Sequence, residues 1–371
     1  MARKQRAMQR GYCRRRRALR TREGARASAL PRVLLLHTGG TLGMDPERSI
    51  DQTTGTLVEG TGGRYLEPSV DLASCVIEQV PEIESLASIT PRVAFNLDSS
   101  RVGVNEWLEL AMELHQARDQ FDAFVCISGT DTMAYLSTAL SFLLAGFGKP
   151  IIVTGSTLPL AKIRSDARQN LIDSICCCTT TEVQLKEVCI CFGGVLLRGN
   201  RARKVNSSLY SAFESPGYPP LARLGVSIEW NVECLLSNVG VYRPRFALNP
   251  NVIRVPICPS QDPFVAYGDL AGRGVCAMLL EVFGTGNMPD LESDGWLPWI
   301  RWQRDQGLYM YLISQCDVGQ LHPELYRAGA AAMEVGVETG PQLTPEAAIV
   351  KLMFCLEQHQ IPVAQPIAGE L

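Results

Sequence analysis

The stretch Val125-Cys-Ile-Ser-Gly-Thr-Asp-Thr-Met133 decides the fold, because an apolar run there ends abruptly in small, hydroxyl-bearing and acidic residues. Ala123 to Ile127 is short, apolar and bounded by turn formers, which predicts a buried strand. From Met133 onward, leucines recur at offsets of 3, 7, 10 and 11, at Leu136, Leu140, Leu143 and Leu144. These residues share one face of a helix. A strand, a tight turn and a helix form the α/β unit whose carboxyl-end turn usually holds a ligand.

Thr130 and Asp131 lie in the turn of this unit, and the turn alone leaves two interpretations open. Thr and Asp are favoured as helix N-caps, because their side chains satisfy free backbone amides. At the carboxyl end of a buried strand, the same side chains are also placed to bind or activate a ligand.

The length and composition predict two domains of unequal size. A chain of 371 residues exceeds the size at which one core usually keeps growing, and its hydrophobic share of 46% supports a real core. No apolar run approaches the ~20 residues needed to cross a bilayer, so we expect no membrane partner.

The charge is distributed unevenly along the chain. Residues 1–32 contain 12 Lys or Arg against one acid, Glu23, whereas the remainder has 23 basic and 37 acidic residues. A disordered arm, an organelle transit peptide and a nucleic-acid contact all fit such a segment. Ser28 is its only serine and Tyr12 its only aromatic residue, which weakens the last two interpretations. We expect a cytoplasmic protein without nucleic acid, or an organellar one if the arm is a transit peptide.

The thirteen cysteines and four histidines do not show the spacing of a metal site. The clusters Cys176-Cys177-Cys178 and Cys189/Cys191 have neither C-x-x-C spacing nor nearby histidines. We therefore expect no metal, and mostly buried, reduced thiols.

A second turn of similar design follows the apolar run Val33 to Leu36. It reads His37-Thr38-Gly39-Gly40-Thr41-Leu42-Gly43-Met44. Gly39 and Gly40 permit positive φ and let backbone amides approach a ligand closely. The pattern is neither Gly-x-Gly-x-x-Gly nor a phosphate loop, so we expect no nucleotide and no other cofactor.

The rest of the chain alternates strands and helices, which predicts an α/β fold. Residues 45–68 are rich in Thr, Gly, Ser and charge and predict a long mobile loop, typical of a lid. Further strands are expected at 92–97, 150–154, 187–192, 252–257, 275–283 and 309–313, and helices at 72–80, 82–86, 107–114, 166–175, 296–306 and 345–357. This pattern predicts a mostly parallel sheet flanked by helices in a larger domain, 33–230. After the arm 1–32, the expected order is this domain, a linker at 231–251 and a smaller α/β domain at 252–371.

Four polar clusters follow expected strand ends in the larger domain. They are Thr38 to Thr41, Asp98 to Ser100, Ser128 to Asp131, and the approach to Lys204. Such ends meet in one crevice of an open sheet. A lysine with a lowered pKa can remove a proton from a hydroxyl, and backbone amides can stabilise an oxyanion. The set suits acyl transfer on a small polar amide.

Two of these segments, Thr38-Gly-Gly-Thr-Leu-Gly-Met44 and Gly129-Thr-Asp-Thr-Met133, resemble the signature motifs of the L-asparaginases. Further segments resemble the type I, cytosolic-type branch: Asp98-Ser-Ser100, Gly148-Lys-Pro-Ile-Ile-Val-Thr-Gly155, Arg164-Ser-Asp166, Arg198-Gly-Asn-Arg201 and Phe283-Gly-Thr-Gly-Asn287. The resemblance covers residues 33–357. It implies hydrolysis of L-asparagine to L-aspartate and ammonia by a homo-oligomer, a dimer or tetramer.

The resemblance also implies a role for each matching residue. Thr41 would be a catalytic threonine that forms an acyl-enzyme, and Thr130, Asp131 and Lys204 would supply a second hydroxyl, a carboxylate and a base. Asp98, Ser99 and Ser100, with Asp131, would hold the α-amino and α-carboxylate groups of the substrate. Asn287 would reach the substrate from the second domain.

The sequence departs from the family at the loop tyrosine that activates the first threonine. No tyrosine follows Met44 closely, and Tyr65 is the candidate, although an ordinary surface tyrosine fits equally well. Arg101 and Ala167 stand where an acid and a glycine are usual. The alternatives are a broader asparaginase-glutaminase, an amidotransferase subunit, or a non-catalytic amino-acid-binding relative.

Overall fold

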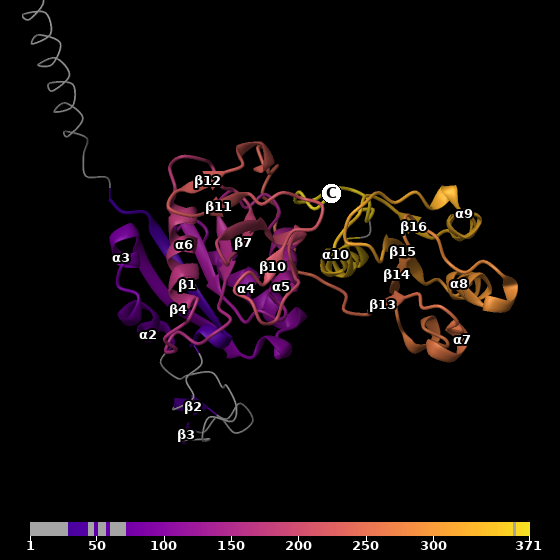
Figure 1. Cartoon of the computed structure of the whole chain (residues 1–371), viewed down its shortest axis with the longest axis horizontal. Helices are drawn as coiled ribbons and strands as arrows, with labels where there is room; N and C mark the ends of the chain where they lie inside the picture. The colour runs from indigo at the N-terminus through magenta and orange to yellow at the C-terminus, as the bar shows by residue number, and fades with distance from the viewer. Residues whose placement is uncertain (1–28, 44–47, 51–56, 60–71, 359–360) are drawn as a thin grey trace, which may run out of the picture.

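The computed structural model describes residues 29–43, 48–50, 57–59, 72–358 and 361–371. Tyr65 lies outside these residues. Two sheets organise them, one in a larger N-terminal domain and one in a smaller C-terminal domain (Figure 1).

The larger domain is built on an eight-stranded sheet with the order β12-β11-β8-β7-β6-β5-β1-β4. Five adjacent strands run parallel: β1 (Arg32–Gly39), β4 (Ser88–Leu97), β5 (Ala123–Ile127), β6 (Ile151–Thr154) and β7 (Val188–Phe192). Three antiparallel strands extend the sheet at one side: β8 (Val195–Arg198), β11 (Ala222–Leu224) and β12 (Ile228–Trp230). The predicted mostly parallel sheet is confirmed, with this antiparallel extension added.

Helices cover both faces of the sheet, which explains why its central strands are apolar throughout. On β1, Leu34 and Leu36 join one buried cluster, whereas Val33 and Leu35 join the other. The first cluster includes residues of α4 (Val104–Ala117) and α5 (Met133–Leu143), and the second residues of α2 (Leu72–Gln79), α3 (Ile83–Leu86) and α6 (Ala167–Thr179).

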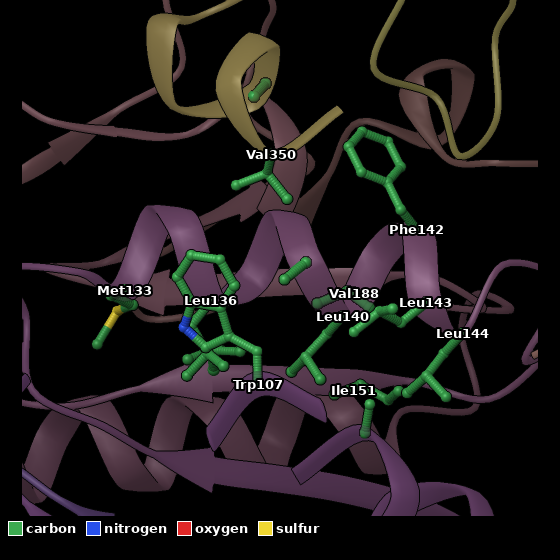
Figure 2. Close-up of a cluster of buried hydrophobic side chains, with 14 of the residues drawn as sticks. Trp107, Met133, Leu136, Leu140, Phe142, Leu143, Leu144, Ile151, Val188 and Val350 are labelled. Carbon is green, nitrogen blue, oxygen red and sulfur yellow. The ribbon is translucent and has the colours of Figure 1, made fainter. Parts of the chain in front are cut away.

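Helix α5 follows the turn after β5 and is buried almost all round, as expected for a helix that is apolar on every side. Leu136, Leu140 and their neighbours belong to a cluster with Trp107, Ile151 and Val188 (Figure 2). On its other side, Phe142 lies with its ring centroid 5.9 Å from that of Phe354 in the C-terminal helix α10 (Pro345–Glu357). The two domains therefore share this core.

The smaller domain contains a parallel sheet of four strands with the order β13-β14-β15-β16. The strands are β13 (Val252–Pro256), β14 (Ala277–Val282), β15 (Tyr309–Ser314) and β16 (Glu338–Thr339). Its helices are α7 (Pro263–Ala266), α8 (Trp296–Asp305), α9 (Arg327–Glu334) and α10. Predicted and observed bounds agree for α10 and β5, and differ by a few residues elsewhere.

Two expectations need correction. The predicted loop at 45–68 contains, in its described part, an antiparallel pair of strands, β2 (Arg48–Ile50) and β3 (Leu57–Glu59). The N-cap position of α5 is held by Thr132, and neither Thr130 nor Asp131 caps this helix. A further short pair, β9 (Arg203–Lys204) and β10 (Phe213–Glu214), was not predicted. Strands of two or three residues are too short to show a period of two.

Candidate active site

The turns after β1, β4 and β5 lie side by side, because β1 pairs with both other strands in parallel register. Gly39 pairs with Leu97, and His37 with Ile127. The chain passes from β1 to β4 on one side and then to β5 on the other, which is a topological switch point where α/β sheets bind ligands.

Two glycines let these turns touch. Gly40 has φ +86°, and a Cβ there would overlap the backbone of Gly129. A Cβ on Gly129 would lie 2.6 Å from both Cβ and Oγ of Ser99. The turn carrying Thr41, the turn carrying Thr130 and the turn carrying Ser99 are therefore in van der Waals contact, which brings three of the four predicted polar clusters together.

Threonine side chains tie the same turns together with hydrogen bonds. Thr132 Oγ1 donates to the carbonyl oxygen of Ser99 at 2.8 Å, and Thr38 Oγ1 donates to that of Ile127 at 2.9 Å. Thr132 is not among the site residues predicted from the sequence. Its position as the last hydroxyl residue before the apolar helix could have identified it as the N-cap.

Lys204, on strand β9, belongs to the fourth predicted cluster and contacts the turn after β5. Its Nζ lies 2.7 Å from Thr130 Oγ1 and 2.6 Å from Asp131 Oδ1. The Lys204 side chain is 23% exposed and that of Asp131 is 67% exposed, so the pair opens to solvent on the carboxylate side. Lys204 pairs in the β9–β10 ladder with Phe213, which is buried against Phe192 and so fixes the strand. The side chains of Thr130 and Asp131 thus contact the lysine.

Asp98 and the two serines after β4 form a compact polar turn. Asp98 caps the 3-10 helix η2 (Ser99–Arg101), and its Oδ1 accepts hydrogen bonds from Ser100 N at 2.8 Å and Ser100 Oγ at 2.6 Å. Ser99 is buried beneath Gly129, whereas Ser100 is exposed. The turn presents a carboxylate and a hydroxyl near the surface.

Thr41 begins the short 3-10 helix η1 (Thr41–Gly43) and is half-buried. The following Leu42 is buried and its carbonyl oxygen accepts a hydrogen bond from Leu160 N at 3.2 Å, which anchors the turn from the other side. Thr41 therefore stands on a fixed backbone beside the other two turns.

His37 stabilises the backbone of the turn that carries Thr41. Its ring is 2% exposed, and Nδ1 accepts a hydrogen bond from Gly39 N at 2.9 Å, which places the ring proton on Nε2. Burial lowers the pKa of His37 to about 4, because the charged imidazolium would lose its hydration. His37 is therefore a neutral acceptor that holds Gly39 in its turn conformation.

Two predicted residues are not brought to this cluster by any described contact. Tyr65 lies outside the described residues. Asn287 is exposed in the smaller domain, where its Oδ1 accepts from Met288 N at 3.0 Å. Its role in substrate binding stays a prediction.

Within the described ranges, no group of three His, Cys, Asp or Glu side chains could hold a metal ion. In the same part of the chain, no helix is long and apolar enough to span a membrane. The chemistry available at the cluster is that of hydroxyls, carboxylates, an amine and backbone amides.

Comparisons with known proteins identify the family. The chain matches the family model "Asparaginase, N-terminal" over residues 32–235 and the "Glutaminase/Asparaginase C-terminal domain" over residues 252–364. It is 33% identical to L-asparaginase 1 of Escherichia coli, over 74% of this chain and 82% of that protein. It is 31% identical to a 60 kDa lysophospholipase of Mus musculus, over 88% of this chain and 59% of that protein.

Among solved structures, L-asparaginase I from Vibrio cholerae superposes with a TM-score of 0.77 at 28% identity, covering 92% of this chain and 99% of that one. The mixed α/β architecture, with its larger and smaller sheet domains, is that of this structure. The chain spans about half the length of the first curated relatives it matches. By both domain matches and by this fold, the chain belongs to the asparaginase family, in its type I branch.

Proposed function

We propose that the protein is an L-asparaginase, an amidohydrolase that converts L-asparagine to L-aspartate and ammonia. The observation that carries the proposal is the contact of Lys204 Nζ with Thr130 Oγ1 and Asp131 Oδ1 beside the turn of Thr41. The names of the E. coli and Vibrio cholerae relatives support the same activity. No cofactor is required by this chemistry.

The reaction we propose has two acyl-transfer steps. Thr41 Oγ1 bonds to the side-chain carbonyl carbon of asparagine, the carbon–nitrogen bond breaks, and the amide nitrogen leaves as ammonia after taking up a proton. Lys204, oriented by Asp131, accepts through Thr130 the proton that Thr41 releases and returns it to the leaving nitrogen, and backbone amides of the Gly-rich turn stabilise the developing oxyanion. Water then attacks the acyl ester, releases aspartate and restores the Thr41 hydroxyl. Tyr65 remains our candidate for activating Thr41.

Substrate binding is assigned to the turn after β4. The Asp98 carboxylate would pair with the substrate α-ammonium, with Asp131 assisting, and Ser99 and Ser100 would donate to the α-carboxylate. Without substrate, Ser100 N and Oγ donate hydrogen bonds to Asp98. On binding, hydrogen bonds to the substrate would replace them. Asn287 would complete the contacts from the smaller domain.

The proposal is tested by measuring ammonia release from asparagine and from glutamine by the purified chain. We expect release from asparagine, abolished in Thr41→Ala and strongly reduced in Thr130→Val. A kcat/KM for glutamine close to that for asparagine would favour the broader asparaginase-glutaminase. Binding of asparagine without ammonia release would instead make the protein a non-catalytic amino-acid-binding relative.

The remaining assignments concern the organisation of the protein. We propose an N-terminal arm at 1–32, an active-site domain at 33–230, a linker at 231–251 and a second domain at 252–371, assembled as a homo-oligomer in the cytoplasm. Light scattering on the purified chain would give the mass of a dimer or tetramer. A monomer at micromolar concentration would contradict the assembly.

A further inference from the structure

The C-terminal tail, Ile367 to Leu371, returns from α10 to the larger domain and accepts three hydrogen bonds there. Asn200 Nδ2 donates to the carbonyl oxygen of Ala368 at 2.9 Å. Arg198 Nη1 and Arg201 Nε donate to that of Gly369, at 3.1 Å and 3.0 Å. All three donors belong to the segment Arg198–Arg201, which ends three residues before Lys204.

A buried ion pair fixes the tail in this position. Lys351 of α10 and Glu370 of the tail are both 0% exposed, and Lys351 Nζ lies 2.5 Å from Glu370 Oε1. The Glu370 carboxylate also accepts from Ile367 N at 2.9 Å and from Ala368 N at 2.7 Å, and Lys351 Nζ donates to the carbonyl oxygen of Gln365 at 2.7 Å. A buried pair in which both partners make further hydrogen bonds holds one geometry.

The segment Arg198–Arg201 is also held from its other side, by α5. Ser137 Oγ donates to the carbonyl oxygen of Gly199 at 2.9 Å, and a Cβ on Gly199 would lie 3.0 Å from Ser137 Cβ. Helix α5 begins two residues after Asp131, and α10 packs on it through Phe142 and Phe354. The same two helices therefore support both partners of the contact between Lys204 and Thr130.

We propose that the C-terminal tail is a positioning device for Lys204. The ion pair of Lys351 and Glu370 fixes the tail, and the hydrogen bond from Asn200 to the tail fixes the segment that leads into β9. The amine of Lys204 is thereby kept against Thr130 and Asp131. These residues touch neither the substrate nor the reacting atoms. As a statement about catalysis, the inference rests on the proposed function.

Two variants loosen the tail without leaving a buried charge unpaired. Asn200→Ala removes the donor to Ala368, and the double variant Lys351→Met with Glu370→Gln removes both charges together, which proteins often tolerate. Displacement of a catalytic group lowers kcat by about tenfold to a hundredfold, and we expect this loss with KM little changed. Gln365→Ala is the matched control: it changes an exposed side chain just before the tail and keeps the carbonyl that Lys351 binds, so its kcat should equal that of wild type.

A readout independent of turnover separates this inference from the proposed function. Reductive methylation with ¹³C-formaldehyde labels Lys204, whose resonance is assigned by its loss in Lys204→Met, and the chemical shift of its labelled methyl groups reports the contacts of the amine. We expect the Lys204 chemical shift to move in Asn200→Ala and in the double variant, and to stay unchanged in Gln365→Ala. If both variants lower only the melting temperature, with kcat and the Lys204 chemical shift as in wild type, the tail is merely structural and the proposal is overturned. A wild-type chain without asparaginase activity would refute the function, while the chemical shift would still decide the role of the tail.

Discussion

The ε-amine of Lys204 lies 2.7 Å from the hydroxyl oxygen of Thr130, although the lysine follows the threonine by 74 residues. The contact joins the turn after β5, in the parallel part of the sheet, to the two-residue strand β9, which lies in the chain between β8 and β11. A third group, Asp131, orients the amine at 2.6 Å. Hydroxyl, base and orienting carboxylate are thus arranged as in activated-nucleophile sites generally.

Replacing Lys204 by Met should lower kcat by about a hundredfold to ten-thousandfold, because this removes the amine that we propose exchanges a proton with Thr130. The methionine retains the length of the side chain, and Asp131 is exposed enough to remain hydrated, so the melting temperature should change little. Steady-state ammonia release and thermal unfolding measure the two effects. The matched control is Lys186→Met, at the amino end of β7. Equal losses in both variants would show that Lys204 has no special part in catalysis.

Gly129→Ala should disturb substrate binding more than folding. The added methyl would lie 2.6 Å from Ser99 Cβ and Oγ, so the turn after β4 must move away from the turn of Thr130. We expect KM for asparagine to rise by about tenfold or more, since a displaced serine would lose the contact with the substrate that we propose for it. Gly225→Ala provides the control, because the nearest atom to its added methyl is 3.9 Å away. A normal KM in Gly129→Ala would mean that Ser99 does not bind the substrate.

The parts of the fold that could be predicted from sequence are those with continuous apolar runs or regularly spaced apolar residues. The apolar run Val33 to Leu36 and the leucines of α5 identify β1 and α5, because a buried strand and a buried helix need uninterrupted apolar faces. Strands β8 to β12 have two to four residues each and are fixed by pairing across the sheet, which no local pattern records. Likewise Thr130 and Thr132 are chemically equivalent in sequence. Only the positions of Lys204 and Ser99 decide that the first contacts the lysine and the second bonds to the turn after β4.

His37 should make stability depend on pH in the mildly acidic range. Its pKa is about 4 in the folded protein and 6.5 in the unfolded chain, so the unfolded chain binds the proton more readily. The stabilisation from the neutral ring is complete above pH 6.5 and is lost as pH falls toward 4, by about 3 kcal/mol in total. Urea unfolding of wild type and His37→Asn between pH 7.5 and 4 measures this. The variant keeps an acceptor for Gly39 N but does not titrate, so its free energy of unfolding should fall less steeply. Parallel curves would show that His37 titrates normally.

Deleting residues 1–30 should leave kcat and the melting temperature nearly unchanged, as expected of a basic segment without an apolar pattern. The deletion keeps the two described contacts at the start of the fold. Pro31 accepts a hydrogen bond from Ser88 N at 2.9 Å, and Arg32 pairs with Asp122 at 3.1 Å. A fall of several degrees in melting temperature, or a large loss of activity, would show that the arm belongs to the folded protein.

Glu187→Ala should destabilise the protein strongly, because the residue pairs with Arg198 inside the larger domain. The two side chains are 3% and 4% exposed, and their closest nitrogen and oxygen atoms lie 2.5 Å apart. Glu187 also accepts from Leu236 N at 2.9 Å, so its removal leaves a buried guanidinium and a backbone amide without this carboxylate. Breaking such a pair costs about 3–5 kcal/mol, measured as the free energy of unfolding in urea. Glu82→Ala is the control: its partner Arg168 is about half exposed, and surface pairs contribute at most about 1 kcal/mol.

Because Arg198 also binds the tail at Gly369, the loss of Glu187 should lower kcat as well, whereas Glu82→Ala should not. Similar unfolding energies for the two variants would mean that the Glu187–Arg198 pair contributes no more than a surface contact.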